Sequence, residues 1–192
     1  MVTVSTLQLK DRAYHHGDLR SALIEAGLNA LQSAPVEELS LRALAREVGV
    51  SATAVYRHFP DKQALLAALA DSGLERLGRY QQEAADAAGP EQAFGATGRA
   101  YVRWALANPA LFRLVFACNA ALGETVFGQS LAARMLQANA AAATADEDEA
   151  RRLVVQAWAL VHGLAMLMLD GQLPSDDALI ERVIEPNTLF PR

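Results

Sequence analysis

The chain has 192 residues, of which 52% are hydrophobic, and a formal net charge of −5. This size is sufficient for a small domain of about 60 residues followed by a larger helical one. The first 20 residues contain Lys10, Asp11 and Arg12 and no apolar run, so no secretory signal peptide is expected. The single Cys118 excludes an internal disulfide framework, and we expect a cytoplasmic protein with a reduced thiol.

The charge is distributed unevenly along the chain. Residues 1–62 carry seven Lys and Arg against seven Asp and Glu, so all the excess acid lies after Lys62. A chain with this excess of negative charge does not bind polyanions such as DNA indiscriminately. Any contact with nucleic acid would depend on a local patch of oriented donors.

The N-terminal segment predicts an arm followed by a helix. Residues 1–13 are expected to form a flexible arm, in which Lys10 and Arg12 either contact DNA or remain in frayed, solvated chain. From Tyr14 onward a helix is predicted, with Asp18 as its N-cap. Its apolar stripe consists of Leu19, Leu23, Ala26, Gly27, Ala30 and Leu31.

Two short helices joined by a glycine are predicted next. Apolar residues of Leu41–Val48 recur at i, i+3, i+4 and i+7, which is one face of a helix. Ser40 can cap its start, and Gly49 stands where the chain must turn. Ser51 can cap the following helix, whose inner face is formed by residues 55 and 59 and which Pro60 ends.

The outward positions of that second helix suit a nucleic-acid surface. Small residues near its start let the backbone approach a groove, while Thr, Tyr, Arg and His side chains donate to phosphates or base edges. This pattern predicts a helix-turn-helix element. Asp61 can cap a further helix with Lys62 in its first turn, where the helix dipole favours an acid. Either a phosphate docked there explains the lysine, or its side chain is simply solvated.

The residues from Gly49 to Ser51 and from Val55 to Leu66 resemble the N-terminal signature of the TetR family of bacterial transcriptional regulators. The segment Tyr14–Arg20 is similar to the entry segment of many of these proteins. The resemblance implies an all-α fold of about nine helices. A three-helix helix-turn-helix DNA-binding domain over 14–64 would precede a larger helical bundle for ligand binding and dimerisation over 65–192.

The resemblance also implies roles for single residues. It assigns phosphate contacts to Arg42, Tyr56, His58 and Lys62, and base contacts to Ala52, Thr53 and Arg57. Ala54 stands where related sequences often carry Thr, which leaves only apolar contact with a thymine methyl. The candidate DNA-binding residues are therefore Arg42, Ser51, Ala52, Thr53, Ala54, Tyr56, Arg57, His58 and Lys62. The alternatives are that the tyrosine packs, the histidine caps its own helix and the arginine is solvated.

The C-terminal part begins with long helical patterns. Residues 65–88 predict one long helix that ends at Gly89 and would link the two domains. A helix over Glu91–Ala107 follows, and Asn108-Pro109 separates it from a short apolar segment at 110–116. Aromatic residues here either line a cavity or pack in the core. The candidate ligand-binding residues are Tyr101, Trp104, Phe112, Phe116, Trp158, His162 and Met166.

The run Leu153–Leu169 is nearly all apolar and, at about 1.5 Å per residue, could almost cross a bilayer. Gln156 and His162 within it argue against a membrane. We expect a helix with one face against its own domain and the other against a partner subunit. Trp158, His162 and Gly163 also resemble the Trp-His-Gly signature of one C-terminal class of the family, in which the imidazole either bonds a buried carbonyl or meets a ligand.

The expected partner is a second copy of the chain. Ser175 can cap a last helix that extends through Glu185. The helices at about 150–171 and 175–186 would then form a four-helix dimer interface. Such a two-fold dimer is what a palindromic operator requires.

The expected function is a homodimeric repressor that binds double-stranded DNA and is released by a small, largely apolar effector. Two alternatives remain open: a helical ligand-binding or interaction protein without DNA contact, and a hydrolase-like enzyme using Cys118 with His162. The enzyme hypothesis has little support, because Arg113 is the one nearby cation and no nucleophile elbow or phosphate loop occurs. The His15-His16 pair lacks a ligand cluster, so we expect no metal, no cofactor and no catalysis.

Overall fold

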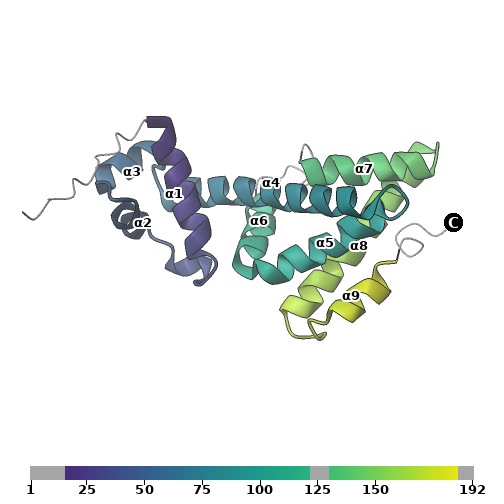
Figure 1. Ribbon diagram of the computed structural model, residues 1–192. Coiled ribbons are helices and arrows are strands. Elements are labelled where there is room, and N and C mark those ends of the chain that lie inside the picture. Colours follow the sequence, from purple (N-terminus) through teal and green to yellow (C-terminus); the bar gives the residue numbers. More distant parts are fainter. Residues whose placement is uncertain (1–15, 122–129, 186–192) are drawn as a thin grey trace, which may run out of the picture.

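The structure is a computed structural model that describes residues 16–121 and 130–185 (Figure 1). Over these ranges the chain forms nine α-helices, one short 3-10 helix and no strand, which confirms the predicted all-α fold. The helices are α1 (His16–Ala30), η1 (Val36–Glu38), α2 (Leu41–Val48), α3 (Ala52–His58), α4 (Lys62–Ala88), α5 (Ala93–Ala107), α6 (Pro109–Ala121), α7 (Leu131–Ala143), α8 (Glu147–Leu169) and α9 (Asp177–Val183). The predicted arm at 1–13, Tyr14 and the side chain of Cys118 lie outside the described part.

Local signals in the sequence determine several helix ends. The Ser51 hydroxyl accepts a hydrogen bond from the Ala54 N–H at 3.2 Å and caps α3, and an oxygen of Asp61 accepts from the Ala64 N–H at 2.8 Å and caps α4. Gly49 has a φ of 78°, a left-handed conformation that closes α2. These three predictions are confirmed.

Three other predicted caps are wrong. Ser40 has an extended backbone and its carbonyl accepts from the Leu44 N–H at 3.0 Å, but its side chain makes no cap. Asp18 lies inside α1, since the helix already includes His16. Asp176 caps α9 in place of Ser175, as its carboxylate accepts from the Ala178 N–H at 3.0 Å and carries the charge that a helix start favours.

The long helix α4 connects the two ends of the molecule. It has 27 residues, about 40 Å at 1.5 Å per residue. The bundle of α1, α2 and α3 lies at its N-terminal end, and α5 to α9 lie around its remaining length (Figure 1). The predicted start of this helix at residue 65 was three residues late, because Asp61 caps it at Lys62.

Helix α6 packs closely on α4 and also reaches the N-terminal bundle. A Cβ atom added at Gly73 would lie 2.8 Å from Cγ2 of Val115 and 2.9 Å from Cδ1 of Leu111, so the absence of a side chain lets the helices approach. At the α5–α6 junction, Gln32 Nε2 donates to Asn108 Oδ1 at 3.0 Å. The two ends of the molecule therefore contact each other independently of the α4 backbone.

Helix α8 is buried on one face within the chain. Leu153, Ala157, Val161, Leu164, Ala165 and Met168 form that face. Val155 and Leu167 on other faces are 62% and 45% exposed. By length and composition α8 could cross a membrane, but a third of its apolar window is buried and it packs against α5 and α7. The second buried face expected from the sequence is not formed within a single chain.

The caps provide a test of the local structure. Ser51→Ala should lower the free energy of unfolding by about 1 kcal/mol, because the Ala54 N–H loses its acceptor. Ser40→Ala is the matched control and should leave stability unchanged, since that hydroxyl makes no cap. Urea denaturation followed by circular dichroism measures both, and equal losses in the two variants would contradict the assignment.

Candidate DNA-binding and effector sites

Helix α3 presents one face to the core and one to solvent. Val55 and Phe59 are 0% and 1% exposed, as their spacing predicted. Thr53, Tyr56 and Arg57 are exposed on the opposite side, Tyr56 at 44%. A rigid apolar anchor on one face and free donors on the other are what a helix needs to enter a major groove.

Not all the candidate DNA contacts are equally exposed. Ala52 and His58 are half-buried, whereas Ser51 is exposed and occupied as the cap of α3. Ala54 differs from the expected outward position, because it is half-buried and packs against the core. On α2, Arg42 is exposed and lies in the first turn of the helix.

Lys62 has a partner that the sequence did not indicate. Its Nζ donates to the backbone carbonyl of Glu37 in η1 at 2.8 Å. The lysine therefore connects the start of α4 to the segment that precedes α2. An ammonium group has three donors, so two are left for another acceptor.

Arg20 was not recognised from the sequence as part of this unit. Its guanidinium carbon lies 5.4 Å from the ring centroid of Phe59, a cation–π contact that connects α1 to the end of α3. Its sequence signal is weak, because an arginine on the polar side of a predicted helix ordinarily indicates solvent.

The second site is an aromatic cluster shared by α5, α6 and α8. The ring of Phe116 lies with its centroid 4.8 Å from that of Phe112 and 4.7 Å from that of His162, and Tyr101 packs edge-on against Phe112 at 5.6 Å. Trp158 lies 5.6 Å from His162. Five of the seven predicted ligand-binding residues therefore lie in this cluster, and a sixth, Trp104, packs edge-on against Phe112 at 6.4 Å.

A hydrogen bond inside this cluster defines the state of the imidazole. Tyr101 Oη and His162 Nδ1 are 2.9 Å apart. Burial lowers the pKa of His162 below its ordinary value, which favours the neutral ring, and Nδ1 accepts from the tyrosine hydroxyl in the tautomer that carries its proton on Nε2. Burial also raises the pKa of Tyr101 strongly, against a smaller opposing effect of a hydrogen bond with Trp158, so the phenol keeps its proton.

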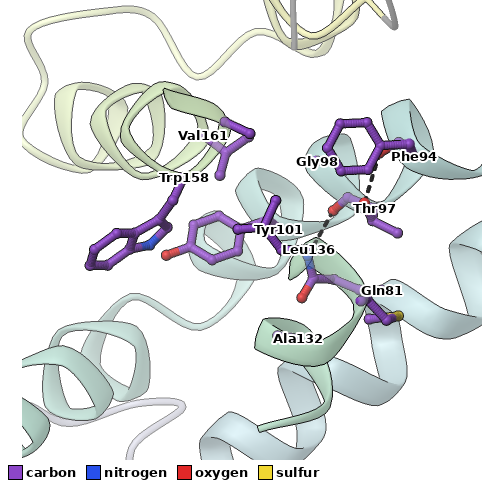
Figure 2. A pocket seen from close by; sticks show the side chains of 11 residues that line it. Gln81, Phe94, Thr97, Gly98, Tyr101, Ala132, Leu136, Trp158 and Val161 are labelled. Carbon is purple, nitrogen blue, oxygen red and sulfur yellow. Dashed lines mark hydrogen bonds between the residues drawn. The ribbon is translucent and has the colours of Figure 1, made fainter. Parts of the chain in front are cut away.

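A cavity of about 40 Å³ lies beside the cluster (Figure 2). Tyr101 and Trp158 line it, as expected, but Trp104, Phe112, Phe116, His162 and Met166 do not. Trp104 and Phe112 are core residues in edge-on contact with each other. The lining residues that sequence reasoning missed are Gln81, Thr97, Gly98, Ala132, Met135, Leu136, Ala157 and Val161, whereas Phe94 is one of the aromatic residues expected either to line a cavity or to pack in the core.

A more open groove of about 470 Å³ lies next to the cavity, between the C-terminal end of α4, the start of α5 and α7. Thr97 and Met135 line both spaces, so they form the partition between them. Among the residues that the structure describes, no three His, Cys, Asp or Glu side chains come together as a metal site would require.

Two family models match the chain. The model for "Bacterial regulatory proteins, tetR family" matches residues 23–69, and that for "Tetracyclin repressor-like, C-terminal domain" matches residues 94–186. The first covers the helix-turn-helix unit, and the second covers α5 to α9 together with Trp158, His162 and Gly163. The chain belongs to the TetR family. It is a transcriptional regulator with a DNA-binding helix-turn-helix domain, and its family is one of regulatory proteins.

Individual relatives of this TetR-family chain agree with the assignment. Nucleoid occlusion factor SlmA of Marinomonas sp. (strain MWYL1) is 37% identical over 70 residues, an alignment that covers 34% of this chain and only 36% of that protein. The structure of a protein of unknown function from Rhodococcus sp. RHA1 is 33% identical with a TM-score of 0.69, and covers 90% of this chain and 94% of that one. The flavonoid-responsive regulator FrrA shares the fold, at 24% identity and a TM-score of 0.56 over 88% of this chain and 92% of its own.

The buried imidazole predicts a pH dependence of stability. Below about pH 6.5 the unfolded chain binds a proton that the folded chain resists, so stability should fall as the pH falls through this range. His162→Asn, which keeps an acceptor but does not titrate, should reduce this loss when thermal unfolding is compared at neutral and mildly acidic pH.

Tyr101→Phe tests whether burial of His162, rather than its hydrogen bond with Tyr101, causes the acid sensitivity of stability. It keeps the imidazole and its burial, so the acid sensitivity should persist if desolvation is responsible. An identical pH dependence in wild type and His162→Asn would contradict the assignment.

Proposed function

We propose that the chain is a cytoplasmic, homodimeric repressor of a palindromic operator, and that a small, largely apolar effector releases it. The exposed face of α3, held on an apolar core that is shared with α4, is the observation that carries the proposal. Ligand binding at the far end of α4 can then change the position of the DNA-reading helix.

In the proposed complex, α3 enters the major groove. Thr53 and Arg57, which are exposed on one side of the helix, contact base edges, and Ala52 lets the backbone approach. Arg42, Tyr56 and His58 hold phosphates. Lys62 joins them through the donors that the Glu37 carbonyl leaves free, so one side chain both orders η1 and contacts DNA.

A dimer follows from the outer face of α8. Val155 and Leu167 are large, apolar and exposed, and Ala159, which lies between them in the sequence, is exposed as well. Next to α8, the short α9 is fixed on α5, because Arg103 makes hydrogen bonds of 2.7 and 2.6 Å to Asp177 and Glu181. Pairing α8 and α9 with a second copy would cover this face, and a palindromic operator then requires the two α3 helices to lie about 34 Å apart, one DNA turn.

The proposed release of the operator depends on the contacts between the N-terminal bundle of α1 to α3 and the C-terminal helices. The cavity residue Gln81 and the proposed phosphate contact Lys62 belong to the same helix, and Asn108 connects the α5–α6 junction to Gln32 in the N-terminal part. A ligand that repositions α4 or α6 therefore changes the distance between the two α3 helices of the proposed dimer. To release the operator decisively it must favour the incompetent state by roughly 4–6 kcal/mol.

Selection of random DNA by the purified protein tests the proposal. We expect enrichment of one palindromic sequence at moderate salt. Arg57→Ala should relax the preference at one position of each half-site at a cost of about 1–3 kcal/mol. Arg42→Ala should weaken binding to all sequences and lower the salt slope by about one.

Arg79→Ala, an exposed arginine of α4 away from the helix-turn-helix unit, is the matched control and should bind like wild type. Failure to enrich any sequence would overturn the proposed operator binding. Equal effects of the Arg42 and Arg57 substitutions on all sequences would remove the distinction between phosphate and base contacts.

The dimer is tested by charge on the outer face of α8. Val155→Glu and Leu167→Glu should each convert a dimer to a monomer in analytical ultracentrifugation and reduce operator affinity, because a carboxylate would be buried without a partner. Tyr80→Glu places the same charge on another exposed apolar residue, in α4, and should leave the dimer intact. A monomeric wild type with full operator affinity would contradict the dimer.

A further inference from the structure

We propose that the effector is a neutral aromatic molecule with a hydroxyl or N–H group, and that this group donates a hydrogen bond to Oε1 of Gln81. The ring lies among the aromatic walls of the cavity, and the rest of the molecule extends into the neighbouring groove. This inference rests on the proposed function, because it names the chemical class of the effector for the same site.

Gln81 supplies a buried acceptor without a protein partner. The residue is 7% exposed and lines the cavity, and no described residue bonds its Oε1. Its Nε2 donates to the backbone carbonyl of Thr97 at 3.0 Å. This contact fixes the orientation of the amide, since a rotated amide would set two acceptor oxygens against each other. Figure 2 shows Oε1 on the side of the amide turned away from Thr97.

Both hydroxyl groups among the lining residues already have a hydrogen-bonding partner. Thr97 Oγ1 donates to the Phe94 carbonyl at 2.7 Å, and the Tyr101 hydroxyl lies 2.9 Å from Nδ1 of His162. Gln81 Oε1 is thus the lining side-chain oxygen that lacks a hydrogen-bonding partner among the described residues. A buried acceptor without a donor costs free energy, so the complementary ligand group is a donor.

The walls determine the remaining chemistry. None of the eleven lining residues is charged, so a charged ligand group would lose its hydration without gaining an ion pair. Phe94, Tyr101 and Trp158 contribute aromatic surface. Rings pack favourably against such walls in edge-on or offset geometry, which favours a flat aromatic body over a flexible chain.

The volume indicates how the ligand is accommodated. A cavity of about 40 Å³ is smaller than the ~150 Å³ that a benzene molecule occupies in an engineered protein cavity. The adjoining groove of about 470 Å³ is separated from it by Thr97 and Met135. Methionine is unbranched and adapts its rotamer readily, so displacement of Met135 joins the two spaces.

Isothermal titration calorimetry with matched probes tests the inference on the full-length protein. 2-Naphthol carries the donor, and 2-methoxynaphthalene has the same ring system without it. Wild type should bind 2-naphthol about tenfold or more tightly than the ether, because the ether leaves Oε1 unsatisfied. In Gln81→Met, which keeps length and shape but has no amide, this preference should disappear.

Three controls define the outcomes. Gln137→Met, the same substitution at an exposed position of α7, should keep the preference of wild type. Ala138→Trp fills the groove and should weaken binding of 2-naphthol at least tenfold if the ligand extends there. The carboxylate 2-naphthoate should bind more weakly than the neutral naphthol.

Several results would overturn the inference. These are equal affinity of wild type for the two neutral probes, a preference that survives in Gln81→Met, tight binding of naphthoate, and no binding of either neutral probe. Selective operator binding in the same preparation separates these outcomes from failure of the proposed function. If the protein binds its operator selectively but does not bind naphthol, the proposed regulatory function stands and only the proposed effector class is wrong.

Discussion

The fold depends on one constraint, which is that α4 belongs to both halves of the molecule. Its N-terminal end carries Lys62, which bonds η1, and its distal part carries Gln81, which bonds the backbone of α5. Between them Arg76 forms an ion pair with Glu25 of α1. If α4 moves as one rigid helix in the proposed release, a displacement near Gln81 would also shift the start of the helix at Lys62.

Helix α6 limits how α4 can move. Gly73 lets Leu111 and Val115 pack against the α4 backbone, so the two helices cannot slide past each other without a clash. The adjacent face of α6 contributes Phe112 and Phe116 to the aromatic cluster. Tightly packed interfaces of this kind have discrete alternative arrangements rather than continuous ones, which is the property that a ligand-controlled switch requires.

The sequence predicted those features that depend on near neighbours. Gly49, Ser51 and Asp61 act within four residues of their own position, so their roles follow from local geometry. Ser175 is not the cap of α9, because a cap also depends on which of several adjacent polar groups reaches the free N–H, and here the Asp176 carboxylate reaches it. Tyr101 and Trp158 line the cavity, whereas Trp104 and Phe112 pack in the core, because an aromatic pattern does not distinguish the two settings; ligand binding by these residues stays a prediction. Gln81 was missed, since an amide in an Ala- and Glu-rich helix normally faces water and its burial depends on α5 and α7.

The buried amide also explains why this cavity would select among ligands rather than simply accept apolar ones. An entirely apolar pocket discriminates weakly, because one additional or missing carbon changes the binding free energy by only about 1–3 kcal/mol. A fixed acceptor rejects every ligand that lacks a donor, since the oxygen is then desolvated without compensation. In this chain the acceptor stands on α4 itself. The hydrogen bond that would determine ligand specificity is thus made to the helix that connects the cavity with the DNA-reading unit, so recognition and signalling would share a single contact.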